Sequence, residues 1–161
     1  NHDWVDDWKV LLTKAYGNGS SQDSKQVIGE PIAIAPGSAC TQSYFVAGRF
    51  NSRAETQNFA LYLTTKFVRF LVAQRKISQD ITQSRFLFVP ALDMTQTWTD
   101  SRLYTEFRLE PEEIAYIEKS IGERDWIDSL ESPIPSTHLP GGRKYKAGEA
   151  PVDVDEDEDD E

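Results

Sequence analysis

The segment that begins at Ser52 limits the possible folds more than any other part of the chain. Ser52 and Glu55 match a capping box, in which a serine and a glutamate three residues later satisfy each other's backbone amides at a helix start. Apolar side chains then recur at helical spacing, at Phe59, Leu63, Phe67, Phe70 and Leu71. This pattern predicts one long helix over residues 53–76, and we expect its apolar face to cover a sheet.

Short segments rich in aromatic and β-branched residues supply the strands of that sheet. Four segments have this character, residues 10–12, 27–35, 43–50 and 85–89. Pro31 indicates an edge strand or a bend in the second segment, and Pro90 ends the fourth. The sequence therefore predicts an α+β fold with a small mixed or antiparallel sheet of four or five strands, packed by the long helix.

Two shorter helices are expected after the sheet. Thr99 is placed to cap a helix that runs through Phe107. Pro111 suits the first turn of another helix, two glutamates follow at its positive end, and Gly122 ends it.

Charge and composition divide the chain into two parts. Residues 153–161 contain eight acids in nine positions, so most of the net charge of −10 belongs to this tail. We expect residues 1–128 to form the folded domain, and residues 129–161 to be a Pro/Gly-rich linker and a disordered acidic tail. Residues 1–91 hold ten bases and seven acids, and residues 92–161 hold seven bases and twenty acids. A nucleic-acid surface is therefore expected in the first half.

Composition also excludes several classes of protein. One cysteine cannot form an internal disulfide framework, and two histidines with one cysteine do not make a conventional zinc site. No apolar run approaches the length of about 20 residues that a membrane helix needs. No secretory leader is visible, so we expect a cytoplasmic location. Because the chain begins with Asn1, we expect it to be a piece of a longer protein.

The sequence contains no pattern that is typical of an enzyme. It lacks a phosphate-binding loop and a GxGxxG motif, and neither His2 nor His138 is placed for a catalytic triad. A metal-dependent nuclease would need acids held together by a strand pair, and the candidates are the acids Asp93, Asp100 and Glu106 together with Arg108. These acids flank predicted helices instead. Cys40 is interpreted as a buried thiol rather than a nucleophile.

Positive charge is concentrated between residues 44 and 90, where seven bases accompany two acids. Lys66, Arg69 and Lys76 fall on one face of the predicted long helix, and a basic helix face can lie along a phosphate backbone. The alternative is an ordinary solvated helix face.

A second group of side chains is suited to reading bases. Arginine pairs with guanine and glutamine with adenine, and the candidates are Arg75, Gln79, Gln83 and Arg85. Lys14 and Tyr16, in a turn-like segment, are further candidates for contacting DNA. The alternative is a polar connection between two elements.

Several segments resemble, in the same order, the C-terminal region of adenine-specific DNA methyltransferases of type II restriction–modification systems, including methylase–endonuclease fusions. The segments are KVLLTKAYG, VIGEPIAIAPGSACTQSYFVAG, FALYLTTKFVRFLVAQRKISQD and FVPALDMTQTWTDSRLYTEFRLEPEEIAYIEKSIG. The resemblance covers about residues 8–123. Its most specific parts are APGSACT, RKISQD, and FVPALD followed by WTD.

The resemblance implies target recognition rather than catalysis. In that family an upstream domain binds S-adenosylmethionine and holds the flipped adenine in an Asn/Asp-Pro-Pro-aromatic motif. This sequence contains no Pro-Pro pair, so no catalytic residue, metal or cofactor is expected in the chain itself. The implied partners are double-stranded DNA and the methyltransferase domain upstream in the same protein.

A different class of function stays open. The domain could be a protein-interaction or assembly module, with the acidic tail contacting a basic surface. Apolar exposure on the helix at residues 111–121 would favour this alternative.

Overall fold

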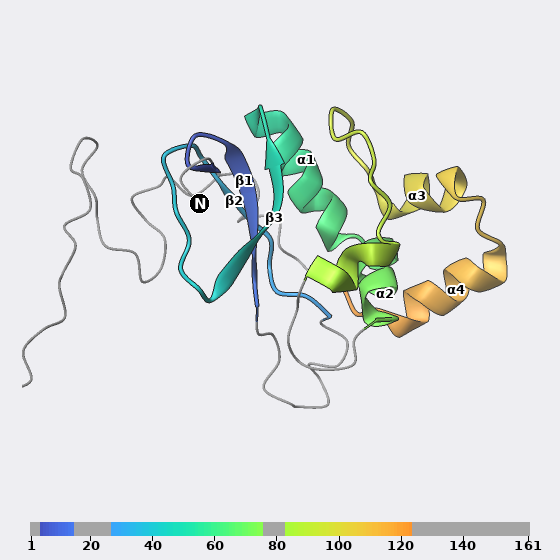
Figure 1. Cartoon of the computed structure of the whole chain (residues 1–161). Coiled ribbons are helices and arrows are strands. Elements are labelled where there is room, and N and C mark those ends of the chain that lie inside the picture. Colours follow the sequence, from blue (N-terminus) through green and yellow to red (C-terminus); the bar gives the residue numbers. More distant parts are fainter. Residues whose placement is uncertain (1–3, 15–26, 76–82, 124–161) are drawn as a thin grey trace, which may run out of the picture.

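The computed structural model describes residues 4–14, 27–75 and 83–123 of the chain (Figure 1). The elements are β1 (Trp8–Thr13), β2 (Ile32–Ile34), β3 (Tyr44–Phe50), α1 (Arg53–Thr64), α2 (Lys66–Ala73), the 3-10 helix η3 (Gln83–Phe88), α3 (Asp100–Glu106) and α4 (Pro111–Ser120). The fold is α+β, as predicted. In Figure 1 the sheet lies on one side, α1 packs beside it, and α2, α3 and α4 lie beyond α1.

The sheet has three antiparallel strands in the order β2-β1-β3. Val10 pairs with Ala33 on one side and with Gly48 on the other. Because β1 is central, the side chains at 10, 11 and 12 are fully buried. The strands expected at 10–12 and 43–50 are confirmed. Of residues 27–35 only Ile32–Ile34 pairs, as an edge strand that begins after Pro31.

The fourth predicted strand is wrong. Residues 83–88 form η3 instead, so the described sheet has three strands rather than four or five. Phe86 of η3 packs against the core and lies near Phe45 of β3, with ring centroids 6.1 Å apart. A short apolar run fits either a strand or a helical turn, and here residues 83–88 form a helical turn that packs against α2 and Phe45.

The single long helix is also a wrong prediction, because the chain leaves the helical conformation at Thr65 (φ −59°, ψ 147°). The Thr65 hydroxyl accepts a hydrogen bond from the backbone N–H of Val68 (3.3 Å). The carboxylate of Asp100 accepts hydrogen bonds from the N–H groups of Lys66 (3.1 Å) and Phe67 (2.9 Å). These acceptors satisfy the free amides of a new helix start, so α2 begins where the sequence pattern predicted continuity. Residue 76, the predicted end, lies outside the described residues.

The predicted helix starts are otherwise confirmed. The Ser52 hydroxyl accepts from the N–H of Glu55 at 3.2 Å, and the Thr99 hydroxyl accepts from the N–H of Arg102 at 3.3 Å. Pro111 is the first residue of α4, which ends at Ser120, shortly before Gly122.

Polar side chains of α1 hold the segment that follows η3 against the helix layer. The Tyr62 hydroxyl donates to the carbonyl of Pro90 (2.9 Å), and the Asn58 amide donates to the carbonyl of Met94 (2.9 Å). These bonds satisfy backbone oxygens in a region without regular structure. Within the described ranges, no helix is long and apolar enough to cross a membrane. The predicted linker and acidic tail, residues 129–161, lie outside those ranges.

Candidate nucleic-acid interface

Arg69, predicted to face a phosphate backbone, is buried inside the helix layer with 2% of its surface exposed. Its Nε donates to the carbonyl of Thr64 (3.0 Å), and its Nη1 donates to the carbonyl of Gly122 (2.9 Å). The guanidinium therefore joins the end of α1 to the end of α4. The expectation that Arg69 belongs to an exposed basic face is wrong, because α4 covers the side of α2 on which Arg69 lies.

Lys66 is also engaged within the fold. Its side chain is 12% exposed, and its ammonium forms ion pairs with Glu118 and Glu123. Glu118 additionally accepts a hydrogen bond from the Tyr104 hydroxyl (2.8 Å). The hydrogen bonds to both glutamates raise the pKa of Lys66, and the bond from Lys66 lowers the pKa of Glu118. The exposed stripe is thus wrong for Lys66 as well, and Lys76 lies outside the described residues.

The Lys66–Glu118 pair predicts a specific acid response. A carboxylate whose folded-state pKa is depressed stabilises the fold above its unfolded pKa, and this contribution is lost as the pH falls through the folded value. The ordinary value for Glu118 is 4.5, so the free energy of unfolding should fall as the pH drops below about that value. We expect Glu118→Gln to make this fall smaller, as measured by urea unfolding at a series of pH values. Glu106→Gln, at an exposed carboxylate on α3, is the control and should leave the fall unchanged. If the free energy of unfolding fell equally with pH in wild type and Glu118→Gln, the Lys66–Glu118 pair would not be the cause of the fall.

The predicted base-reading residues lie around η3, and the structure describes only some of them. Arg75 is half-buried, and its guanidinium carbon lies 5.0 Å from the centre of the Phe88 ring. Arg85 is buried, with 7% exposure. Gln83 begins η3, whereas Tyr16 and Gln79 lie outside the described residues.

Two large apolar side chains project from the end of η3. Leu87 is 71% exposed and Phe88 is 52% exposed. Neither residue is among the candidates from the sequence, because residues 85–89 are predicted there to form a strand. Their only signal in the sequence is an apolar run between the basic segment and Pro90.

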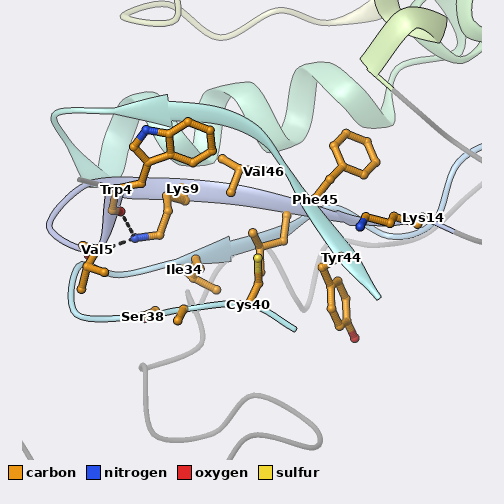
Figure 2. A pocket seen from close by; sticks show the side chains of 12 residues that line it. Trp4, Val5, Lys9, Lys14, Ile34, Ser38, Cys40, Tyr44, Phe45 and Val46 are labelled. Atoms are coloured by element: carbon orange, nitrogen blue, oxygen red, sulfur yellow. Dashed lines mark hydrogen bonds between the residues drawn. The ribbon is translucent and has the colours of Figure 1, made fainter. Parts of the chain in front are cut away.

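Lys14 lies at the same end of the sheet as η3. Its backbone N–H donates to the carbonyl of Ser43 (2.9 Å), which places the end of β1 beside the start of β3. Phe45, two residues further on, contacts η3 through Phe86. Figure 2 shows Lys14, Tyr44 and Phe45 together at this end of the strands. We call Lys14, Arg75, Leu87 and Phe88 the sheet-end surface. By strand register, the exposed Glu30 precedes β2 at this end too.

A pocket of about 260 Å³ lies between the N-terminal turn, the loop at 38–40 and the side of β1 that faces away from the main core (Figure 2). Lys9 lines it with 2% exposure, and its ammonium donates to the carbonyls of Trp4 (2.6 Å), Val5 (3.0 Å) and Asp7 (2.9 Å). Burial lowers the pKa of Lys9. All three ammonium protons tie the N-terminal turn to the sheet, so we assign Lys9 a structural role. Cys40 is a half-buried free thiol at the pocket wall.

Two of the acids considered for a nuclease site, Asp93 and Asp100, have structural tasks. Asp93 accepts a hydrogen bond from the N–H of Thr95 (2.9 Å), which lowers the pKa of Asp93, and Asp100 caps α2. In the described part of the chain, no three histidine, cysteine, aspartate or glutamate side chains are grouped so that they could hold a metal ion.

Comparisons of the chain with protein-family models, with curated proteins and with solved structures gave no match. A function is therefore proposed on the arrangement of the described residues and on the resemblance of the sequence segments.

Proposed function

We propose that the chain is the DNA target-recognition portion of an adenine-specific DNA methyltransferase of a restriction–modification system. The segments that resemble this family span about residues 8–123, and this resemblance supports the proposal. The upstream domain of such an enzyme would bind S-adenosylmethionine and transfer the methyl group. The residues of this chain would bind duplex DNA and hold the target site in register.

The sheet-end surface carries this proposal in the structure. Leu87 and Phe88 present exposed apolar surface beside the cationic Arg75. Proteins that deform DNA insert apolar side chains between base steps, and aromatic rings stack on unstacked bases. Leu87 and Phe88 would make these contacts, and Arg75, stacked on the Phe88 ring, would add a cation next to them. Lys14 would contact a phosphate.

The remaining sequence candidates keep their proposed roles. Lys76 and Gln79 belong to the segment that joins α2 to η3, and Gln83 begins η3. Lys76 would contact a phosphate, and Gln79 and Gln83 would contact base edges. Tyr16 would support Lys14. Arg85 is buried, so we place it beneath the surface rather than on it.

The test of this surface is the double substitution Leu87→Ala/Phe88→Ala. Stacking on a single base contributes about 1–3 kcal/mol, so we expect affinity for DNA to fall about tenfold or more. Fluorescence anisotropy with labelled short duplexes, randomised in their central positions, would measure this at constant salt. Tyr116→Ala removes an equally exposed aromatic side chain on α4 and should leave affinity unchanged.

Salt dependence separates phosphate contacts from base contacts. Lys14→Ala and Lys76→Ala should each reduce the slope of log affinity against log salt by about 1, whereas the double substitution should change affinity more than slope. Absence of DNA binding at low salt, where phosphate contacts are strongest, would overturn the proposed function. Binding that is unaffected by the double substitution would overturn the assignment of the surface.

A further inference from the structure

A second exposed apolar feature lies between α2 and α4, away from the sheet. It is a groove of about 390 Å³. Phe67 and Phe70 of α2 line one side, Tyr116 and Ile117 of α4 line the other, and Glu112 and Glu113 stand at its rim. Figure 1 shows α4 at the side of the molecule opposite the sheet, with α2 between the sheet and α4. None of the residues that line the groove belongs to the sheet-end surface, so the groove is a different surface from the one proposed to contact DNA.

The aromatic side chains of the groove are ordered by contacts with one another. Tyr116 is 63% exposed, and its ring meets that of Phe70 edge-on, with centroids 5.8 Å apart. Phe67 stacks on Phe107 at 5.1 Å. Because these rings already have neighbours, an incoming partner would meet a formed surface and would lose little side-chain entropy on binding.

Residues other than Tyr116 bury α4 in the core and fix its end. Ile117 is buried in the core, and the ion pair of Lys66 with Glu118 and the bond from Arg69 to Gly122 fix the end of the helix. Tyrosine is among the residue types that dominate binding energy at interfaces. An exposed tyrosine that stands over an apolar groove fits a docking surface.

The charges at the rim indicate what the groove can bind. Glu112 and Glu113 are exposed in the first turn of α4. At the other end, the charge of Lys66 is taken up by its pairs with Glu118 and Glu123. The rim is therefore negative around an apolar floor, and it favours a cationic partner over a nucleic acid or an anionic segment.

Two occupants from the same sequence fit poorly. Residues 124–131, which begin shortly after α4, contain three acids and one base, so they would meet the rim with like charge. A second copy of the chain would bring the same two glutamates to the same rim. An amphipathic helix that presents apolar residues three and four positions apart, with lysine or arginine beside them, matches both the floor and the rim.

We propose that the groove between α2 and α4 docks a basic amphipathic helix of a partner protein. Apolar side chains of that helix enter between Phe70 and Ile117, Tyr116 packs along its flank, and its cations pair with Glu112 and Glu113. This gives the chain a protein-binding face that is independent of its DNA-binding face. It combines the two functions that the sequence left as alternatives.

The test uses the full chain and a synthetic helical peptide with leucines on one face and lysines beside them. A peptide with the same leucine pattern and glutamates in place of lysines, and a scrambled Leu/Lys peptide, are the ligand controls. At physiological salt, we expect the patterned Leu/Lys peptide to bind about tenfold more tightly than either control in isothermal titration calorimetry. Equal binding of the Leu/Glu peptide would overturn the charge argument.

Matched variants of the chain locate the site. Tyr116→Ala should weaken binding of the Leu/Lys peptide about tenfold, and Glu112→Gln should weaken it a few-fold. Phe88→Ala and Glu106→Gln remove an aromatic ring and a carboxylate elsewhere and should have no effect. Thermal unfolding would verify that each variant is folded. The acidic tail is present in every variant, so binding that Tyr116→Ala leaves unchanged would place the peptide on the tail and overturn the proposal.

One further measurement tests whether a second copy of the chain, rather than a basic helix, occupies the groove. Analytical ultracentrifugation of wild type and Tyr116→Ala should show the same mass. A dimer that Tyr116→Ala dissociates would assign the groove to a second copy and overturn the proposed occupant. Loss of DNA binding in the Phe88→Ala variant with retained peptide binding would show that the two surfaces act separately.

Discussion

Replacing Arg69 with methionine should lower the free energy of unfolding by about 3 kcal/mol. Methionine fills most of the volume but leaves the carbonyls of Thr64 and Gly122 without their hydrogen bonds from the guanidinium. A hydrogen bond that involves a charged group contributes about 1.5–3 kcal/mol. The Thr64 carbonyl lies at the end of α1, where no intrahelical donor replaces the lost bond, and the Gly122 carbonyl lies just beyond α4. Urea unfolding followed by circular dichroism would measure the change.

Two further variants test whether the loss of stability comes from the two hydrogen bonds of Arg69. Arg69→Lys keeps the charge but cannot reach two carbonyls in different directions, so it should recover only part of the stability. Lys119→Met, at an exposed lysine in the last turn of α4, should change stability by no more than about 0.5 kcal/mol. An Arg69→Met protein that is as stable as wild type but fails to bind DNA would restore the sequence-based interpretation of Arg69 as a phosphate contact.

The second large effect is expected at Asp100. Asp100→Ala should lower the free energy of unfolding by about 2 kcal/mol, because both backbone amides at the start of α2 lose their acceptor. The lost carboxylate also removes a favourable interaction with the positive end of the α2 dipole. Thermal and urea unfolding of the variant would give the magnitude.

The Asp100 result has a structural consequence that can be measured separately. Asp100 begins α3 and caps α2, so its loss should loosen α3 from α2 and increase amide hydrogen exchange in both helices. Asp100→Asn should lower the free energy of unfolding less than Asp100→Ala does, since the side-chain oxygen of asparagine still accepts one hydrogen bond. Ser101→Ala, at the exposed neighbouring position, is the control. An unchanged exchange pattern in Asp100→Ala would show that packing alone holds the break at Thr65.

Several residues of the segments on which the proposed family assignment rests have structural roles, and Asp100 is one of them. Asp100 is the last residue of the WTD segment, and Trp98 in the same segment donates from its indole nitrogen to the carbonyl of Asp93 in FVPALD (2.9 Å). The hydroxyl of Tyr62, in the segment FALYL, donates a hydrogen bond to the carbonyl of Pro90, which is also in FVPALD. These residues of the resembling segments bond to one another and hold the fold together. Recognition of DNA is proposed for side chains that the fold leaves exposed.

The candidate site was only partly predictable. Lys14 is exposed and Arg75 is partly accessible, as a solvent-facing cation should be, and both were identified from residue type and position. Leu87 and Phe88 were missed, because an apolar run in a sequence is interpreted as core unless its neighbours are known. Arg69 was misplaced for a related reason: helical spacing shows which residues share a face but not what covers that face.

The features that the sequence alone determined are the starts of α1, α3 and α4, because each is fixed by residues only a few positions apart. Ser52 and Glu55, Thr99 and Arg102, and Pro111 at its helix start act within a few positions, so their caps could be read directly. The break at Thr65, the helical form of residues 83–88 and the burial of Arg69 depend on contacts with Asp100, Phe45 and Gly122 respectively. Asp100 is 33 positions from Phe67, and Gly122 is 53 positions from Arg69. Only folding brings such distant residues into hydrogen-bonding contact. Local hydrogen bonds therefore define where most helices begin, whereas the number of strands, the helix break and the exposure of each cation follow from packing between distant segments.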